Sequence, residues 1–182
     1  MNTNKLTAAD CAVVVVDMQE RLLPAIHESA RVVVATRLVL HAARVLEIPA
    51  ILTTQYLKGL GATVPDVAEL APGAPIDKLT FSCFGSAEFA AALERTGRRT
   101  LLVCGVEAHI CVLQTGLDAL AAGYRVHVVT DATSSRSPVN AALGHRRLEA
   151  AGAVLSSSEM AIYELLAVSG TSAFKAMLPH FK

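Results

Sequence analysis

Three residues of this chain could together carry out nucleophilic chemistry: a carboxylate, a lysine and a cysteine. Asp17 follows the apolar run of residues 11–16, Lys78 lies in the segment DKLTFS, and Cys111 lies where an apolar run gives way to a helical pattern. A carboxylate can take the proton of a thiol, and a nearby ammonium group stabilises the resulting thiolate. Because thiolates attack carbonyl carbons, this set of residues is suited to covalent hydrolysis.

Cys111 is the most informative of the three because of its surroundings in the sequence. The run 100–103 predicts a buried strand and the pattern of residues 110–122 predicts a helix, which places Cys111 in the first helical turn. Unpaired backbone N–H groups and the helix dipole at that point favour a thiolate over a thiol. Cysteines are nevertheless more often buried and inert than reactive, so Cys111 needs chemical partners in space.

Asp17 and Lys78 each have a simpler interpretation when taken alone. An Asp at a strand end often accepts hydrogen bonds from nearby backbone N–H groups, and a single Lys is usually exposed to solvent. At the mouth of an apolar sheet, however, a partly desolvated carboxylate is suited to act as a general base. The interpretation therefore depends on whether the fold brings Asp17, Lys78 and Cys111 to one edge.

The composition predicts a single domain over residues 1–182 with an aliphatic core. Hydrophobic residues make up 53% of the chain, aromatic residues 4%, and Trp is absent, so Val, Leu, Ile and Ala must fill the interior. The formal net charge of zero argues against nucleic acid or anionic lipid as a partner. The sequence has neither an apolar run of membrane-spanning length nor a signal-peptide core, so we expect a cytoplasmic protein without a membrane partner.

The four cysteines, Cys11, Cys83, Cys104 and Cys111, show neither CxxC pairing nor a spacing to His residues that suits zinc. We therefore expect reduced thiols rather than disulfides or a metal centre. The sequence implies neither a metal nor a cofactor.

Strand-like runs alternate with helix-like runs along the chain. Strands are expected at residues 11–16, 50–54, 76–81, 100–103, 125–130 and 153–155, and helices at 29–47, 86–95, 110–122, 138–151, 160–167 and 171–178. Residues 57–73, rich in Gly and Pro, are expected to form a loop with about one helical turn. This alternation predicts an α/β fold of three layers, with six parallel strands covered by helices on both faces.

Ligands bind at the carboxyl ends of the strands in such sheets. The polar residues expected at or near that edge are Asp17, Gln19, Gln55, Lys78, Glu107, Cys111 and Asp131. We expect the loops 22–29, 56–65 and 132–137 to shape the pocket there.

Three segments together resemble the isochorismatase-like cysteine hydrolases, a superfamily that includes nicotinamidases and N-carbamoylsarcosine amidases. The segments are AVVVVDMQ at 12–19, DKLTFS with Lys78, and GVEAHICV at 105–112, and TTQYLKGLG at 53–61 looks closest to the branch called isochorismatase domain-containing proteins. The resemblance extends from residue 12 to about residue 166. It implies a Rossmann-like three-layer α/β/α hydrolase domain that self-associates into a homo-oligomer.

The resemblance also implies roles for particular residues. Asp17, Lys78 and Cys111 match the catalytic triad of the superfamily, and a cis peptide bond is expected between Val106 and Glu107. The backbone N–H groups of Glu107 and Cys111 match the donors of the oxyanion hole. By this resemblance the protein hydrolyses an amide or related C–N bond of a small molecule through a thioester on Cys111.

The chain departs from two named activities of the superfamily. Nicotinamidases carry metal-binding His and Asp residues after the second strand, where this chain has Gln55-Tyr56-Leu57-Lys58. True isochorismatases cleave an enol ether and generally lack the cysteine, so Cys111 argues against that reaction. Glu107 stands where amidases often have a small residue, so its side chain either narrows the pocket, selects a cationic substrate or points away.

Four further residues are candidates for substrate binding, each with a structural alternative. Gln19 is as well suited to a structural hydrogen bond, and Tyr56 and Phe84 to core or interface packing. His109 precedes Cys111 by two residues and so does not share its helix face, which leaves it as a pocket or surface residue.

Two other classes of function remain open from the sequence. A reactive cysteine could be reversibly oxidised, since Cys104 and Cys111 flank one turn and Cys83 could lie near, which would make this a redox-responsive thiol protein. The fold could also serve as a non-catalytic oligomeric module, because fold alone does not establish activity.

Overall fold

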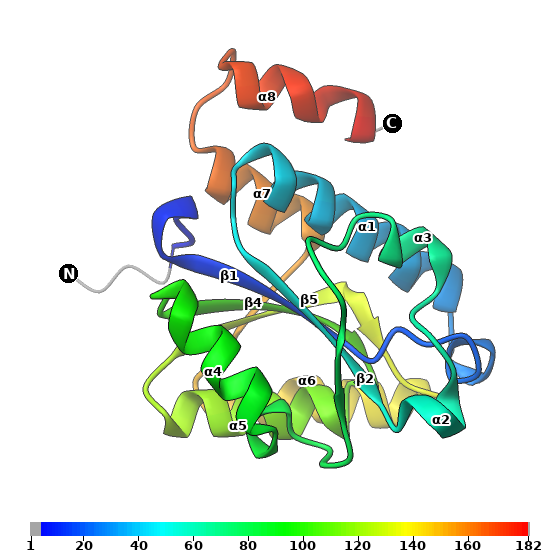
Figure 1. The fold of residues 1–182 in the computed structure, drawn as a ribbon. Helices are drawn as coiled ribbons and strands as arrows, with labels where there is room; N and C mark the ends of the chain where they lie inside the picture. The colour runs from blue at the N-terminus through cyan, green and yellow to red at the C-terminus, as the bar shows by residue number, and fades with distance from the viewer. Residues whose placement is uncertain (1–4, 182) are drawn as a thin grey trace.

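The computed structural model describes residues 5–181, which form a six-stranded, all-parallel sheet between two layers of helices (Figure 1). The spatial order of the strands is β3-β2-β1-β4-β5-β6. Their bounds are Cys11–Val16 for β1, Ala50–Gln55 for β2, Ile76–Lys78 for β3, Thr100–Val106 for β4, Arg125–Ser134 for β5 and Val154–Ser156 for β6. The predicted three-layer α/β/α class is confirmed.

Helices α1 to α6 lie in the connections between successive strands, as parallel pairing requires, and α7 and α8 follow β6. Their bounds are Ser29–Val45 for α1, Leu57–Leu60 for α2, Pro65–Ala68 for α3, Ala87–Thr96 for α4, Cys111–Ala121 for α5, Pro138–Ala150 for α6, Ser158–Leu166 for α7 and Ser172–Met177 for α8. Short 3₁₀ helices occupy Ala8–Asp10, Leu23–Ala25, Cys83–Gly85 and Leu178–Phe181. No helix within residues 5–181 is long and apolar enough to cross a membrane.

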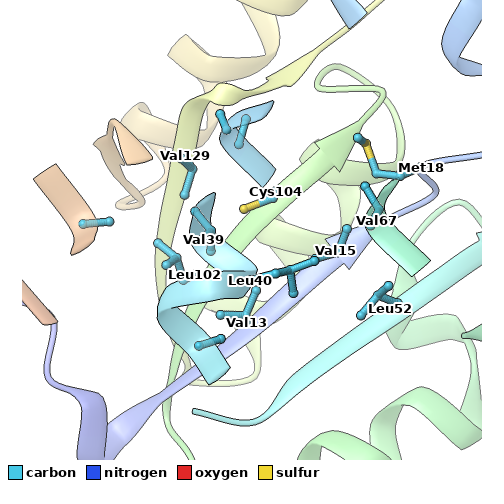
Figure 2. Packing of buried hydrophobic residues seen from close by; sticks show 14 of the residues in the cluster. Val13, Val15, Met18, Val39, Leu40, Leu52, Val67, Leu102, Cys104 and Val129 are labelled. Atoms are coloured by element: carbon cyan, nitrogen blue, oxygen red, sulfur yellow. The ribbon is translucent and has the colours of Figure 1, made fainter. Parts of the chain in front are cut away.

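Strand β1 shows why the sheet lies at the centre of the molecule. All six of its residues are buried, and successive side chains enter opposite cores. Cys11, Val13 and Val15 pack with α1 and α7 on one face, whereas Ala12, Val14 and Val16 pack with α4, α5 and α6 on the other. Figure 2 shows Val13 and Val15 beside Val39 and Leu40 of α1. A β-branched run without alternating polar residues is therefore what a strand covered on both faces needs.

Strands β4 and β5 continue beyond the apolar runs that predicted them. They pair as far as Val106 with Ser134, and a register shift lies between Val103 and Gly105. Pairing between neighbouring strands therefore extends β4 and β5 through residues that have little strand preference of their own. Conversely, β3 ends at Lys78, and the short helix α2 lies in the segment expected to be a loop.

Candidate active site

Asp17 lies directly after β1 and is completely buried. Its backbone has a left-handed conformation, with φ of 51°, and its N–H group donates to the carbonyl of Thr53. One carboxylate oxygen, Oδ1, accepts a hydrogen bond of 2.8 Å from the Thr53 hydroxyl, and the other, Oδ2, lies 2.7 Å from Nζ of Lys78. Asp17 is therefore fixed by two donors, and neither of them is the backbone N–H group that a simple strand-end cap would bind.

Lys78 is the last residue of β3 and its side chain has no exposed surface. Besides Asp17, its ammonium group donates to Gln55 Oε1 at 2.8 Å and to the carbonyls of Thr80 and Phe81 at 3.3 and 3.2 Å. The interpretation of Lys78 as an ordinary surface lysine is therefore wrong. An ammonium group has three N–H donors and four acceptors surround it, so the donors of Lys78 are fully used by groups of the protein.

Cys111 is the first residue of α5 and is 6% exposed, at the edge of a cavity that Asp17 also lines. Burial and the Asp17 carboxylate raise the pKa of the Cys111 thiol to about 12, and the Lys78 charge opposes this rise. A carboxylate beside the sulfur raises the pKa because it disfavours a second negative charge there. The helix start alone favours a thiolate, but burial and the neighbouring carboxylate shift the pKa of Cys111 in the opposite direction.

The turn before Cys111 contains the predicted cis peptide bond between Val106 and Glu107. The carbonyl of Glu107 accepts hydrogen bonds from the N–H groups of Ile110 and Val112, at 3.0 and 3.2 Å. Within residues 5–181, the N–H groups of Glu107 and Cys111 have no hydrogen-bond acceptor. The two amides expected to be oxyanion donors are therefore both available to a ligand.

Two glycines allow backbone segments to approach each other closely around this turn. Gly105 has φ of 108°, and a Cβ atom there would lie 2.1 Å from the carbonyl oxygen of Val16. Gly144 of α6 lies behind the turn, where a Cβ atom would lie 2.7 Å from the carbonyl oxygen of Ala108. Because glycine has no side chain, the backbone of this turn can lie in direct contact with β1 and α6 at these two positions.

A cavity of about 450 Å³ opens above Asp17 and Cys111. Its wall is mainly apolar, and its lining residues are Asp17, Leu22, Ala25, Gln55, Leu60, Phe81, Glu107, Ile110, Cys111 and Arg136. Each of the three loops expected to shape the pocket contributes to this lining. The size and apolar wall suit a small organic molecule.

Glu107 lines the cavity, and Arg136 holds its carboxylate in place. The backbone N–H of Arg136 donates to Glu107 Oε2 at 2.9 Å, and its Nε lies 3.1 Å from both carboxylate oxygens. The Glu107 side chain is 7% exposed and the Arg136 side chain 60%. Of the alternatives considered for Glu107, pointing away from the pocket is therefore excluded.

The other predicted substrate-binding residues do not line this cavity. Gln19 is buried, and its amide binds the backbone of Gln55 and Gly61, which joins two loops. Tyr56 is half exposed, and the Nδ1 atom of His109 lies 2.8 Å from the Ser135 hydroxyl.

Phe84 packs edge-on against Phe89 and Tyr124. It lines a different cavity, of about 260 Å³, together with Tyr124. The position of Phe84 therefore does not support a role in binding a substrate at Cys111.

Sequence reasoning missed two polar residues of the site, Thr53 and Arg136. Thr53 lies inside β2, where a Thr in an apolar run is typical of any strand. Arg136 lies in a loop that was expected to shape the pocket, but its pairing with Glu107 depends on how far β5 extends. Asp131, expected at the sheet edge, lies within β5 and accepts hydrogen bonds from the backbone N–H and hydroxyl of Ser158 at the start of α7.

All four cysteines are free and buried. Burial raises the pKa of Cys83 to about 11 and that of Cys11 to about 12, and it also raises the pKa of Cys104. Within residues 5–181 no group of three His, Cys, Asp or Glu side chains is arranged to hold a metal ion.

The fold and the site together define an isochorismatase-family hydrolase. The model of the isochorismatase domain matches residues 11–160, and the chain belongs to this family. A description of the chain as one domain over residues 1–182 stays a prediction.

Two curated relatives illustrate the similarity. The secreted isochorismatase effector Isc1 of Phytophthora sojae is 36% identical over 168 residues, which are 90% of this chain and 80% of that protein. Isochorismatase domain-containing protein 1 of Danio rerio is 37% identical over 159 residues, 87% of this chain. The chain spans only 56% of the length of the Danio rerio protein.

Three solved structures share the fold over nearly the whole chain. The MAR1 ribonuclease from Caenorhabditis elegans is 38% identical, with a TM-score of 0.90 over 97% of this chain and 91% of its own. YcaC from Pseudomonas aeruginosa, solved with hexane-2,5-diol and covalent acrylamide, is 30% identical, with a TM-score of 0.91 over 99% and 93%. The Escherichia coli YcaC gene product, described as an octameric hydrolase of unknown specificity, is 26% identical, with a TM-score of 0.90 over 100% and 94%.

Proposed function

We propose that this protein is a cysteine-dependent hydrolase of a small-molecule amide or related C–N bond, acting through a thioester on Cys111. The observation that carries the proposal is the position of Asp17. Its carboxylate is paired with Lys78 and lines, together with Cys111, a cavity of about 450 Å³. A base, a cation and a nucleophile therefore meet where a small substrate fits.

In the first half-reaction, Asp17 takes the proton of the Cys111 thiol as the sulfur attacks the substrate carbonyl carbon. The carbonyl oxygen becomes an oxyanion, which accepts hydrogen bonds from the N–H groups of Glu107 and Cys111. As the C–N bond breaks, Asp17 gives its proton to the leaving nitrogen, and the acyl group remains on sulfur as a thioester. Lys78 stabilises the ionised carboxylate before and after this transfer.

In the second half-reaction, Asp17 takes a proton from water while the water oxygen attacks the thioester carbonyl. The C–S bond breaks, the thiolate regains a proton from Asp17, and a carboxylic acid leaves. The raised pKa of Cys111 fits this cycle, because the thiol needs to lose its proton only as it attacks.

Covalent acrylamide in the structure of YcaC from Pseudomonas aeruginosa supports a small, reactive amide as a ligand of this kind of site. The ribonuclease named among the solved structures does not lead us to propose RNA as the substrate. Arg136 is the sole cation in the lining of the cavity among the described residues, and the net charge of the chain is zero, whereas RNA binding needs a basic surface.

Trapping the thioester tests the proposal. The protein is mixed with a panel of small primary and secondary amides, quenched in acid and weighed by intact mass spectrometry, and the modified peptide is mapped. We expect an acyl group, without its amine, on Cys111 of the wild type and none on Cys111→Ala. Turnover of any panel amide that persists in Cys111→Ala would overturn the mechanism.

The alternative of a redox-responsive thiol protein receives less support from the cysteines. Their raised pKa values keep them protonated, and thiols react with oxidants much more slowly than thiolates. A purely structural module would not need a buried Asp17–Lys78 pair beside a cavity.

We also propose that the protein forms a homo-oligomer, as the octameric description of Escherichia coli YcaC suggests. The outer faces of three helices expose apolar side chains, which are Val34 of α1, Val139 and Leu143 of α6, and Met160 and Tyr163 of α7. Light scattering on the eluted protein tests this, and a monomer mass would contradict it. A cytoplasmic location stays a prediction, since the Phytophthora sojae relative is described as secreted.

A further inference from the structure

The hydroxyl of Thr53 is the one polar contact of the Asp17 carboxylate, within the described residues, that the proposed mechanism leaves unused. Thr53 is 1% exposed, and its Oγ1 lies 2.8 Å from Asp17 Oδ1. A buried hydroxyl at that distance is not free to turn elsewhere, and a carboxylate can only accept. We propose that Thr53 is a positioning residue that sets the pH at which Asp17 works as the base of Cys111.

The orientation of the Thr53 hydroxyl has a second support in Cys83. The sulfur of Cys83 lies 3.8 Å from Thr53 Oγ1. Burial, followed by the charge of Asp17, raises the pKa of Cys83 to about 11, so this thiol keeps its proton near neutral pH. Its S–H can then donate to the Thr53 oxygen, which leaves the Thr53 hydrogen directed at Asp17.

The other groups near Asp17 are a cation, two thiols and a second carboxylate. Lys78 of β3 favours the ionised carboxylate, whereas the thiols of Cys111 and Cys83 are neutral at rest. Glu107 lines the same cavity with its carboxylate held by Arg136. Thr53 is the neutral residue that donates a hydrogen bond to Asp17, so replacing it by Val removes one hydrogen bond to the carboxylate without changing any charge.

The consequence follows from what each oxygen of Asp17 does. Lys78 occupies Oδ2 and the Thr53 hydroxyl occupies Oδ1, and a hydrogen bond to the ionised form favours that form. Without the hydroxyl, the carboxylate holds its proton up to a higher pH. When the solution is acidified, it therefore loses the ability to accept the Cys111 proton at a higher pH than in the wild type.

The neighbouring residue provides a matched control on the same strand. Thr54 is also buried, and its hydroxyl also donates to an aspartate, with Oγ1 lying 2.9 Å from Asp77 Oδ1. Successive side chains of a strand point to opposite faces. Thr54→Val therefore removes the same group from the same strand without touching Asp17.

The experiment measures the rate of alkylation of Cys111 by iodoacetamide against pH, with peptide mapping to count only Cys111. It compares the wild type, Thr53→Val, Thr53→Ser and Thr54→Val. Since this inference rests on the proposed function, the wild type must first show an acid limb, a fall in rate as Asp17 becomes protonated. A wild-type rate that rises with pH like a free thiol would contradict the proposed role of Asp17 and this inference together.

With an acid limb present, we expect its midpoint to move up by about one pH unit in Thr53→Val, the size expected for one hydrogen bond to a carboxylate. Thr53→Ser should restore the wild-type midpoint, and Thr54→Val should leave it unchanged. A midpoint in folded Thr53→Val within about 0.3 unit of the wild type would overturn the inference while leaving the proposed function intact. If Thr53→Val does not fold, Thr53→Ala, which also lacks the hydroxyl, gives the same comparison.

Discussion

Strand β1 has an aspartate at each end, and the two make similar contacts with different outcomes. Asp10, before the strand, accepts from the Thr100 hydroxyl at 2.6 Å and pairs with Arg125. Asp17, after the strand, accepts from the Thr53 hydroxyl and pairs with Lys78. Each end of the sheet thus combines a carboxylate, a threonine hydroxyl and a cation.

The two ends differ in exposure and in what else they face. The side chains of Asp10 and Arg125 are 32% and 38% exposed, whereas those of Asp17 and Lys78 are not exposed at all. Burial opposes ionisation of Asp10, but hydrogen bonds from Thr100 and Arg125 outweigh it and lower the pKa of this carboxyl. The Asp10 group joins strand ends, while the Asp17 group faces a thiol and a cavity, so the same residue types are suited to structure at one end and to chemistry at the other.

The largest expected difference between the two ends is in the chemistry itself. Asp17→Asn removes the proposed base and should lower kcat/KM on any trapped amide substrate by at least about 1,000-fold. Asp10→Asn should leave it within about twofold, because Asp10 lies at the opposite ends of the strands. Comparable losses in both variants, with both folded by circular dichroism, would mean that the two ends are not functionally distinct.

The next difference concerns stability. Lys78→Met leaves the Asp17 charge buried without its partner and should lower the free energy of unfolding by about 3–5 kcal/mol. Arg125→Met breaks a part-exposed pair and should cost at most about 1 kcal/mol. Urea unfolding of both variants at neutral pH measures this, and equal losses would contradict the assignment of these two pairs as buried and part-exposed.

The smallest difference is a pH dependence of the Asp10 group. A carboxyl whose pKa is lowered on folding contributes stability above its ordinary value of 3.8, and this stability is lost as pH falls through the lower folded value. Asp10→Asn should therefore be less stable than the wild type at pH 7, by about 1 kcal/mol, and the gap should close in strong acid. Thermal unfolding across this range tests it, and a gap that stays constant with pH would refute it.

The sheet and most of its helices could be predicted because local patterns match the final environment. The continuous β-branched run of β1 is typical of a strand covered on both faces. The side chains of Ser86 and Ser137 each accept a backbone N–H group in the first turn of α4 and α6, as local capping preferences favour. The extensions of β4 and β5 could not be predicted, since they depend on pairing between strands. The short β3 ends where Lys78 turns into the site.

The candidate site was predictable only in part. Parallel topology brings Asp17, Lys78 and Cys111 to one edge, but their exact roles came from resemblance. The direction of the Cys111 pKa shift could not be predicted, because a helix start favours a lower pKa whereas burial, followed by the Asp17 charge, raises it. The Thr53 and Arg136 contacts depend on side-chain positions that no local pattern encodes.

Gly144 gives α6 an unusual mechanical relation to the proposed oxyanion turn. No side chain separates the helix from the backbone of Ala108 and His109, so there is no rotamer to absorb a shift between them. A shift of α6 toward the turn would therefore press directly on the backbone between the two proposed donor amides. The exposed face of this helix carries the apolar side chains of Val139 and Leu143. A molecule bound there would contact the same helix that packs on this turn, from outside the cavity.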